Sequence, residues 1–177
     1  MCSLGIGQNA VYAWIPEDTP AGTEVEELPI EGLEGTEMRL RLVQGAENFR
    51  LEAAEKTLYL ETSLDRDGPE GIRRLKATVE GASLMPGDED FRVNISVQLN
   101  VKDVNDNPPL FPQADYYINI TEELPVGTVV LSGLAAEDAD QEGRNSEIRY
   151  AIKDGPGSDL LAIPMAWEGT ITVRKRI

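Results

Sequence analysis

The sequence has no histidine, a single cysteine and no run of about 20 apolar residues. Without such a run, no segment is expected to cross a membrane. Histidine and cysteine supply many of the bases and nucleophiles of enzymes, and the sequence also lacks a Gly-rich phosphate loop and a nucleophile elbow. We therefore expect no enzyme. The remaining catalytic alternative is acid–base work on glycans by paired carboxylates such as Asp138 and Asp140.

The single cysteine, Cys2, has no second cysteine within the chain with which to form a disulfide bond. Either its partner lies outside this sequence or Cys2 is a free thiol. Residues 1–4 show neither the basic nor the apolar region of a secretory signal, so we expect a signal to be absent or already removed.

Basic residues are scarce beside acidic ones: 16 Lys and Arg stand against 32 Asp and Glu, which gives a formal net charge of −16. This balance disfavours nucleic-acid phosphates and anionic lipids as partners and favours cations. The 41% of hydrophobic residues is enough for packed cores, and 177 residues allow one domain or two small ones. The chain is therefore expected to be globular.

Acidic and amide side chains gather in four short segments, a pattern that indicates calcium binding. Residues 103–107, Asp-Val-Asn-Asp-Asn, place four oxygen-bearing side chains in five positions and are followed by two prolines. Ca²⁺ takes about 6–8 oxygen ligands, so one such segment is not sufficient. The other ligands are expected from Glu17, from Asp65 and Asp67, and from residues 138–145.

An internal repeat and a period-two pattern predict an all-β chain of two modules. Residues 17–23 return in similar form as residues 122–128, a spacing of 105 residues that is close to one β-sandwich domain. In residues 91–102, six apolar residues alternate strictly with six polar ones, as in a half-buried strand. Further strands are predicted at residues 11–15, 38–43, 57–61, 75–79, 116–120, 128–131, 148–152 and 170–173.

Taken together, the DxNDNxP-like linker, Leu64-Asp65-Arg66-Asp67, the DxDxGxN-like residues 138–145 and the repeated Glu-x-x-Pro-x-Gly motif resemble the cadherin superfamily. The resemblance implies two tandem Greek-key β-sandwich repeats, residues 1–107 with the linker and residues 108–177, joined by a calcium-binding linker. The second repeat is expected to be incomplete, because Ile177 aligns with Leu64 of the first.

The same resemblance implies about three calcium ions at the linker. Asp67 is one methylene shorter than the Glu of most cadherins, so it is expected to bind one ion rather than bridge two. Glu122 would serve a joint with a following repeat. The implied ligands are Glu17, Asp65, Asp67, Asp103, Val104, Asn105, Asp106, Asn107, Asp138, Asp140 and Asn145.

A narrower resemblance is to the first two repeats of the protocadherin-15 branch or its insect microvillar counterpart. It rests on the early Cys2, on residues 64–69 and on residues 163–176, although the cysteine expected near Gly81 is missing. It implies a membrane-anchored ectodomain on the extracellular side of the plasma membrane, whose tip binds another cadherin, cadherin-23-like or of its own kind. The alternative is a calcium-stiffened spacer with no adhesive surface of its own.

The first predicted strand offers candidate interface residues. Alternation places Val11, Ala13 and Ile15 inward, which leaves Tyr12 and Trp14 facing outward as interface anchors, unless Trp14 packs on a neighbouring loop. Two sequons, at Asn94 and Asn119, are candidate N-glycosylation sites.

Overall fold

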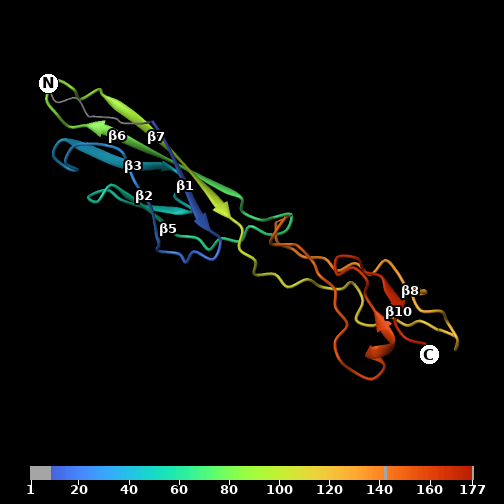
Figure 1. The fold of residues 1–177 in the computed structure, drawn as a ribbon. Helices are drawn as coiled ribbons and strands as arrows, with labels where there is room; N and C mark the ends of the chain where they lie inside the picture. Colours follow the sequence, from blue (N-terminus) through green and yellow to red (C-terminus); the bar gives the residue numbers. More distant parts are fainter. Residues whose placement is uncertain (1–8, 142, 177) are drawn as a thin grey trace. The chain divides into compact units, whose positions relative to one another are not determined.

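The computed structural model describes residues 9–141 and 143–176, which form two units that divide between Val104 and Asn105 (Figure 1). Each unit is built from strands and turns, and no α-helix occurs among the described residues. Nor does this part of the chain hold any helix of the length and apolarity that a membrane crossing requires. Cys2 lies outside the described residues, so both alternatives for it, a partner outside this sequence or a free thiol, stay predictions.

The first unit is a sandwich of two sheets. One sheet has four strands in the order β1-β7-β6-β3, in which β1 runs parallel to β7 and the other pairs are antiparallel. The second has three antiparallel strands in the order β2-β5-β4. The strands are β1 (Ala10–Pro16), β2 (Glu24–Glu27), β3 (Met38–Gln44), β4 (Phe49–Glu52), β5 (Thr57–Leu60), β6 (Arg74–Ser83) and β7 (Arg92–Lys102).

The core of the first unit lies between these two sheets. On β7 the side chains of Val93, Ile95, Val97 and Leu99 are buried, as the period-two alternation predicts. Residues of both sheets pack with them. The fully or almost fully buried members include Met38, Leu40, Phe49, Leu58, Leu60, Ala77 and Val79.

The second unit contains one small sheet and long irregular segments. Its strands β8 (Val129–Leu131), β10 (Ile171–Val173) and β9 (Leu161–Ala162) pair in that order, and a 3-10 turn, η1 (Ser158–Leu160), precedes β9. Leu110 and Glu137 form an isolated antiparallel bridge with two backbone hydrogen bonds of 2.8 Å. This bridge fixes the chain just after the two prolines beside the segment that carries Asp138 and Asp140.

Two predicted strands, residues 116–120 and 148–152, are wrong, because the structure has no strand in either segment. Their equivalents in the first unit are β1 and β3, which pair with β7 and β6. In the described part of the second unit no strand forms a ladder with either segment, and the Tyr150 N–H instead donates to the carbonyl of Ala166 at 2.6 Å. Strands β2, β4 and β9, each of two to four residues, were not predicted.

Candidate metal centre

The first cluster of predicted ligands forms where β1 and β7 end. Glu17 directly follows β1, and its N–H donates to the carbonyl of Lys102, the last residue of β7, at 3.0 Å. The Glu17 side chain is buried, with the residue 4% exposed. Its Oε1 accepts from the Val104 N–H at 2.8 Å and its Oε2 accepts from the Arg66 N–H. Backbone donors from two other segments therefore hold this carboxylate in place.

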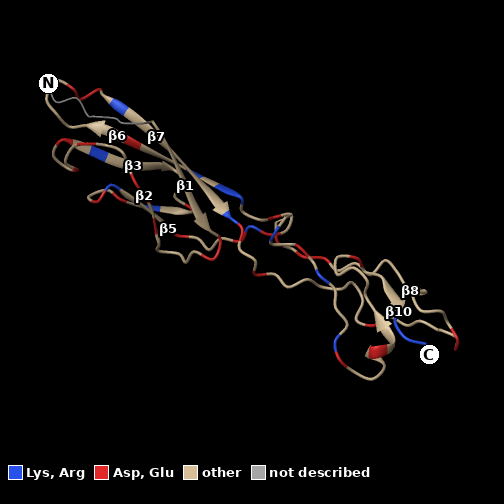
Figure 2. Ribbon diagram, viewed as in Figure 1, with Lys and Arg blue, Asp and Glu red and all other residues tan. Residues whose placement is uncertain are grey.

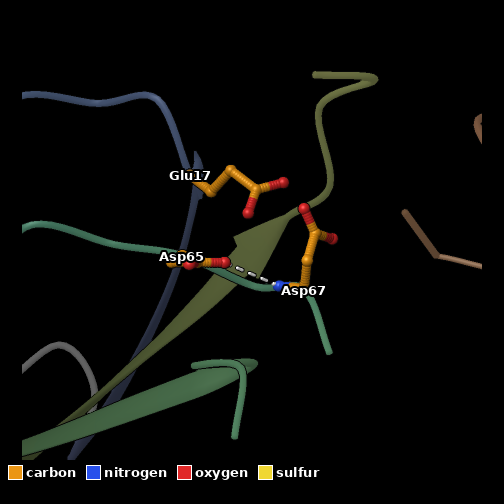
Figure 3. Close-up of side chains that lie close together, drawn as sticks. All are labelled: Glu17, Asp65 and Asp67. Atoms are coloured by element: carbon orange, nitrogen blue, oxygen red, sulfur yellow. Dashed lines mark hydrogen bonds between the residues drawn. The ribbon is translucent and has the colours of Figure 1, made fainter. Parts of the chain in front are cut away.

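The loop after Leu64 brings two more carboxylates to Glu17 (Figure 3). The Asp67 N–H donates to Asp65 Oδ1 at 3.0 Å, and the Ile72 N–H closes the loop on the Asp65 carbonyl at 2.6 Å. One carboxylate oxygen from each of Glu17, Asp65 and Asp67 lies within 4.8 Å of the other two. The loop thus gathers three of the predicted ligands.

Two residues that position this loop were not predicted. The Arg66 guanidinium Nη1 donates to the carbonyl of Val101 at 2.6 Å and so ties the loop to the end of β7. At Gly71 an added Cβ would lie 1.9 Å from the Arg66 carbonyl oxygen, so the loop closes only with glycine at this position. No sequence pattern signals either contact, because both depend on the folded path of the loop.

The charges of the first cluster repel one another. Two carboxylates about 5 Å apart repel by on the order of 1–3 kcal/mol, depending on the effective dielectric constant. The burial of Glu17 strengthens this repulsion, because water screens it less there. All the gathered side-chain donors are oxygens, the donors that Ca²⁺ prefers. The first cluster therefore fits a hard divalent cation.

The second unit gathers its own predicted ligands around Asp140. The Asp140 N–H donates to Asp138 Oδ1 at 3.0 Å. Asp140 Oδ1 accepts from both the backbone N–H and the side-chain amide of Asn107, at 3.1 and 2.9 Å. The Asn105 amide donates to the Asn145 carbonyl at 2.7 Å. Five predicted ligands are thus in contact within this unit.

Asp140 is the predicted ligand whose surroundings favour a cation most clearly. The residue is 5% exposed, and its Oδ2 has no hydrogen-bond partner among the described residues. Burying a carboxylate oxygen without a partner costs several kcal/mol in order of magnitude, unless a cation or a donor compensates it. The carboxylates of Asp138 and Asp140 and the carbonyl of Asn145 are oxygen ligands of the kind that Ca²⁺ prefers, so the second cluster also fits Ca²⁺.

Three of the remaining predicted ligands lie on the linker, and the fourth residue, Glu122, lies in a turn of the second unit. Asp103 and Val104 are half-buried, and the Val104 N–H contacts Glu17. Asp106 is exposed, and its Oδ1 accepts from the Asn107 amide at 2.9 Å. Glu122 is exposed in a turn of the second unit and belongs to neither cluster.

The predicted surface residues are accessible. Tyr12 is 66% exposed and Trp14 60% exposed, whereas Ala13 between them is 5% exposed. The predicted orientation of this strand is confirmed, and Trp14 does not pack away on a loop. Asn94 and Asn119, the two sequon residues, are also exposed.

Comparison with known proteins identifies the family. A family model described as Cadherin-99C-like, immunoglobulin-like domain matches residues 1–105. This chain is a cadherin. Human Cadherin-7 is 32% identical over 174 residues, which cover 93% of this cadherin and 22% of the relative. Protocadherin-15 of Gallus gallus is 32% identical over 138 residues, covering 72% of the chain and 7% of the relative. The chain thus spans about a fifth of the length of Cadherin-7 and less of protocadherin-15.

Solved cadherin structures share the fold. Mouse cadherin-23 EC22-24 matches with a TM-score of 0.75 and 26% identity, covering 97% of this chain and 53% of that structure. Human protocadherin-24 EC1-2 matches with a TM-score of 0.74 and 26% identity, covering 96% and 74%. The predicted fold class, all-β with tandem β-sandwich repeats, is confirmed.

The family has a general class of function. Cadherins are extracellular adhesion proteins of membranes and not enzymes, and their repeats generally bind Ca²⁺ at the linkers. They bind other cadherins, of their own kind or of another. The particular ions, partner and branch of this cadherin are matters for proposal.

Proposed function

We propose that this cadherin is a calcium-dependent adhesion fragment in which about three Ca²⁺ ions bind the two clusters on either side of the Val104–Asn105 bond. The observation that carries the proposal is Asp140, which is buried with one carboxylate oxygen unpartnered. The cluster of Glu17, Asp65 and Asp67 supports it independently. The division between repeats at residue 107 and the full ligand set remain predictions from the family resemblance.

Calcium is proposed to stiffen the junction through the chain itself. Val104 and Asn105 are consecutive, and each belongs to a segment that its own cluster holds by hydrogen bonds. Bound Ca²⁺ would supply positive charge shared among the carboxylates of each cluster. Glu17 would then hold Val104 and the carbonyl of Asn145 would hold Asn105, one on each side of a single peptide bond, so that the linker loses its freedom to bend.

The stiffened junction is proposed to present the first unit as an adhesive tip. The exposed pair of Tyr12 and Trp14 supports this view against a spacer without an adhesive surface, because large exposed aromatics are frequent anchors of protein interfaces. The partner class is another cadherin tip, cadherin-23-like or a copy of this one. The parent protein is proposed to be anchored in the plasma membrane outside this chain.

The protocadherin-15 branch, with roles in tip links or microvilli, is proposed from the family resemblance. The Cadherin-99C-like match to residues 1–105 is compatible with it. The longer match to Cadherin-7, 174 residues against 138, favours the superfamily without favouring this branch.

The test of the proposed function combines melting and binding. Thermal unfolding of the wild type in millimolar calcium and in chelator, compared with Asp140→Asn, is expected to show a calcium-dependent rise that the variant loses in large part. Capture of a cadherin-23-like tip or self-association in calcium would support the adhesive part. A calcium-dependent rise without any capture or association would reduce the proposal to the spacer alternative, and no rise would refute the calcium part.

A further inference from the structure

The outward side of the four-stranded sheet carries an aromatic and basic patch. Cross-strand pairing puts Trp14 opposite Asn100 and Asn100 opposite Arg74. Two residues farther along the strands, a second row joins Tyr12, Gln98 and Lys76. Side chains in one row share a face of the sheet, and rows two residues apart lie on the same face. We call Tyr12, Trp14, Arg74 and Lys76 the aromatic–basic face.

The aromatic–basic face is open and unusual in so acidic a protein. Tyr12, Trp14, Arg74 and Lys76 are all exposed, and neither Arg74 nor Lys76 forms an ion pair with another described residue. More basic side chains lie farther along the same side of the sheet, on β3 and β7, and show as blue segments in Figure 2. They are Arg39, Arg41 and Arg92, and one acidic residue, Glu80, lies opposite Arg41 on the same side.

The opposite side of the sandwich has the opposite charge. On the outward side of the second sheet, Glu24 pairs with Tyr59 and Glu27 with Thr57. We call Glu24, Glu27, Glu52, Glu55 and Glu61 the acidic face. Its one cation, Arg50, contacts Glu61 at 2.9 Å and Glu52 at 3.6 Å and lies 4.5 Å from the centre of the Tyr59 ring. The acidic face therefore keeps an excess of negative charge.

The charges on this face also act on Tyr59. The Tyr59 hydroxyl donates to Glu55 Oε2 at 2.9 Å. This hydrogen bond, followed by desolvation and by the negative charges of Glu55 and Glu24, raises the pKa of Tyr59 above its usual value. Two carboxylates of the acidic face thus lie beside Tyr59: Glu55 through this hydrogen bond and Glu24 through strand pairing.

From these two faces we infer that copies of this cadherin associate side by side, with the aromatic–basic face of one copy on the acidic face of the next. The two faces cover opposite sheets of one sandwich, so each copy offers both halves of the contact. Such a contact joins two different surfaces and can repeat along a row of copies. The inference rests on the adhesive part of the proposed function, which already offers Tyr12 and Trp14 as anchors and a second copy as one partner, and it adds the surface of the second copy that they contact.

Charge complementarity selects a second copy as the occupant. The chain as a whole has a net charge of −16, so copies repel one another at long range. At physiological ionic strength the Debye length is about 8 Å, which screens distant charges but not those of two faces in contact. Trp14 and Tyr12 supply the apolar contact area that a purely ionic surface would lack.

The sequon at Asn94 is compatible with this contact. Asn94 lies on the same side of the sheet, but four residues before Gln98 on β7. At about 3.4 Å per residue, this places it about 14 Å from the row of Tyr12 and Lys76. A glycan at Asn94 would therefore extend beside the aromatic–basic face rather than from within it.

Two charge-reversed variants test the inference. The first, Arg74→Glu with Lys76→Glu, makes the aromatic–basic face acidic. The second, Glu24→Lys with Glu27→Lys, makes the acidic face more basic. All four side chains are exposed, so both variants are expected to fold.

Sedimentation velocity over a concentration series, in millimolar calcium, measures the strength of self-association. We expect the wild type to self-associate and each variant alone to associate at least about tenfold more weakly, because like charges then meet. An equimolar mixture of the two variants is expected to associate again, since each supplies the complement of the other. Trp14→Ala is expected to weaken wild-type association roughly tenfold.

A control matched to the first variant carries the same change in net charge in the second unit. Lys153→Glu with Arg174→Glu reverses two exposed cations of the second unit and is expected to associate as the wild type does. A monomeric wild type, undiminished association of either face variant, or a mixture that fails to associate would overturn the inference. Calcium-dependent melting can persist in all of these cases, so failure here is distinguishable from failure of the calcium proposal.

Discussion

Replacing Glu17 with glutamine tests the first cluster with almost no change in shape. Glu17 is buried and accepts hydrogen bonds from the N–H groups of Val104 and Arg66. Glutamine offers one carbonyl oxygen and turns an NH₂ group toward the second backbone donor. The variant therefore loses one charge-assisted hydrogen bond and one negative charge.

The two losses act in opposite directions without calcium. The lost hydrogen bond costs about 1.5–3 kcal/mol. Removal of the charge relieves repulsion from Asp65 and Asp67, which is on the order of 1–3 kcal/mol for each pair at about 5 Å and is smaller for the exposed Asp65. In chelator, we therefore expect the free energy of unfolding of Glu17→Gln to stay within about 2 kcal/mol of the wild type.

With calcium bound, the variant no longer gains from relieved repulsion, because the cation already offsets the repulsion in the wild type. At a free concentration of about 100 times Kd, one site stabilises the wild type by about 2.7 kcal/mol, and a tenfold weaker site by about 1.4 kcal/mol. For a unit of this size, roughly 4–8 °C in Tm corresponds to each kcal/mol. The calcium-dependent rise in Tm should therefore shrink by roughly 5–10 °C in Glu17→Gln.

Thermal unfolding followed by circular dichroism, with and without chelator, measures this difference. Glu31→Gln is the control, because Glu31 is exposed and lies outside both clusters. It should show the same calcium-dependent rise as the wild type. An equal rise in the wild type, Glu17→Gln and Glu31→Gln would refute the placing of calcium at Glu17.

Three further predictions concern single residues. Asp106→Ala is expected to remove most of the calcium-dependent rise in Tm, and an unchanged rise would exclude Asp106 from the ligands. Gly71→Ala should destabilise the chain by about 1–3 kcal/mol in denaturant unfolding, because its Cβ would meet the Arg66 carbonyl at 1.9 Å, whereas Gly155→Ala, with no atom within 4 Å, should not. Glu55→Ala should lower the pKa of Tyr59 in an ultraviolet titration, because it removes the hydrogen bond that raises this pKa; an unshifted titration would contradict the geometry of the acidic face.

The sequence predicted the first unit better than the second, for a physical reason. The strict alternation of residues 91–102 determines which side of β7 is buried, whatever its neighbours are. Residues 116–120 alternate too, but a strand also needs a partner, and the described second unit provides none for them. The alternating pattern therefore predicted β7 correctly, but it predicted a strand at residues 116–120 that the structure does not have.

The sequence predicted which candidate ligands come together, but not the residues that position them. The spacing of acidic and amide residues selected Glu17, Asp65, Asp67 and Asp140, which the structure gathers within their own units. The contact of Arg66 with Val101 joins residues 35 positions apart and leaves no trace in local composition. The charge difference between the two sheets likewise appears only when the strand order is known.

The number of calcium ions bound per chain tests the central claim most directly. Equilibrium dialysis of the purified chain against saturating calcium, with the ions counted by atomic emission, gives this number without reference to stability or partners. We predict about three ions for the wild type and fewer for Asp65→Asn and for Asp140→Asn. Less than one ion bound per chain of the wild type would contradict the account.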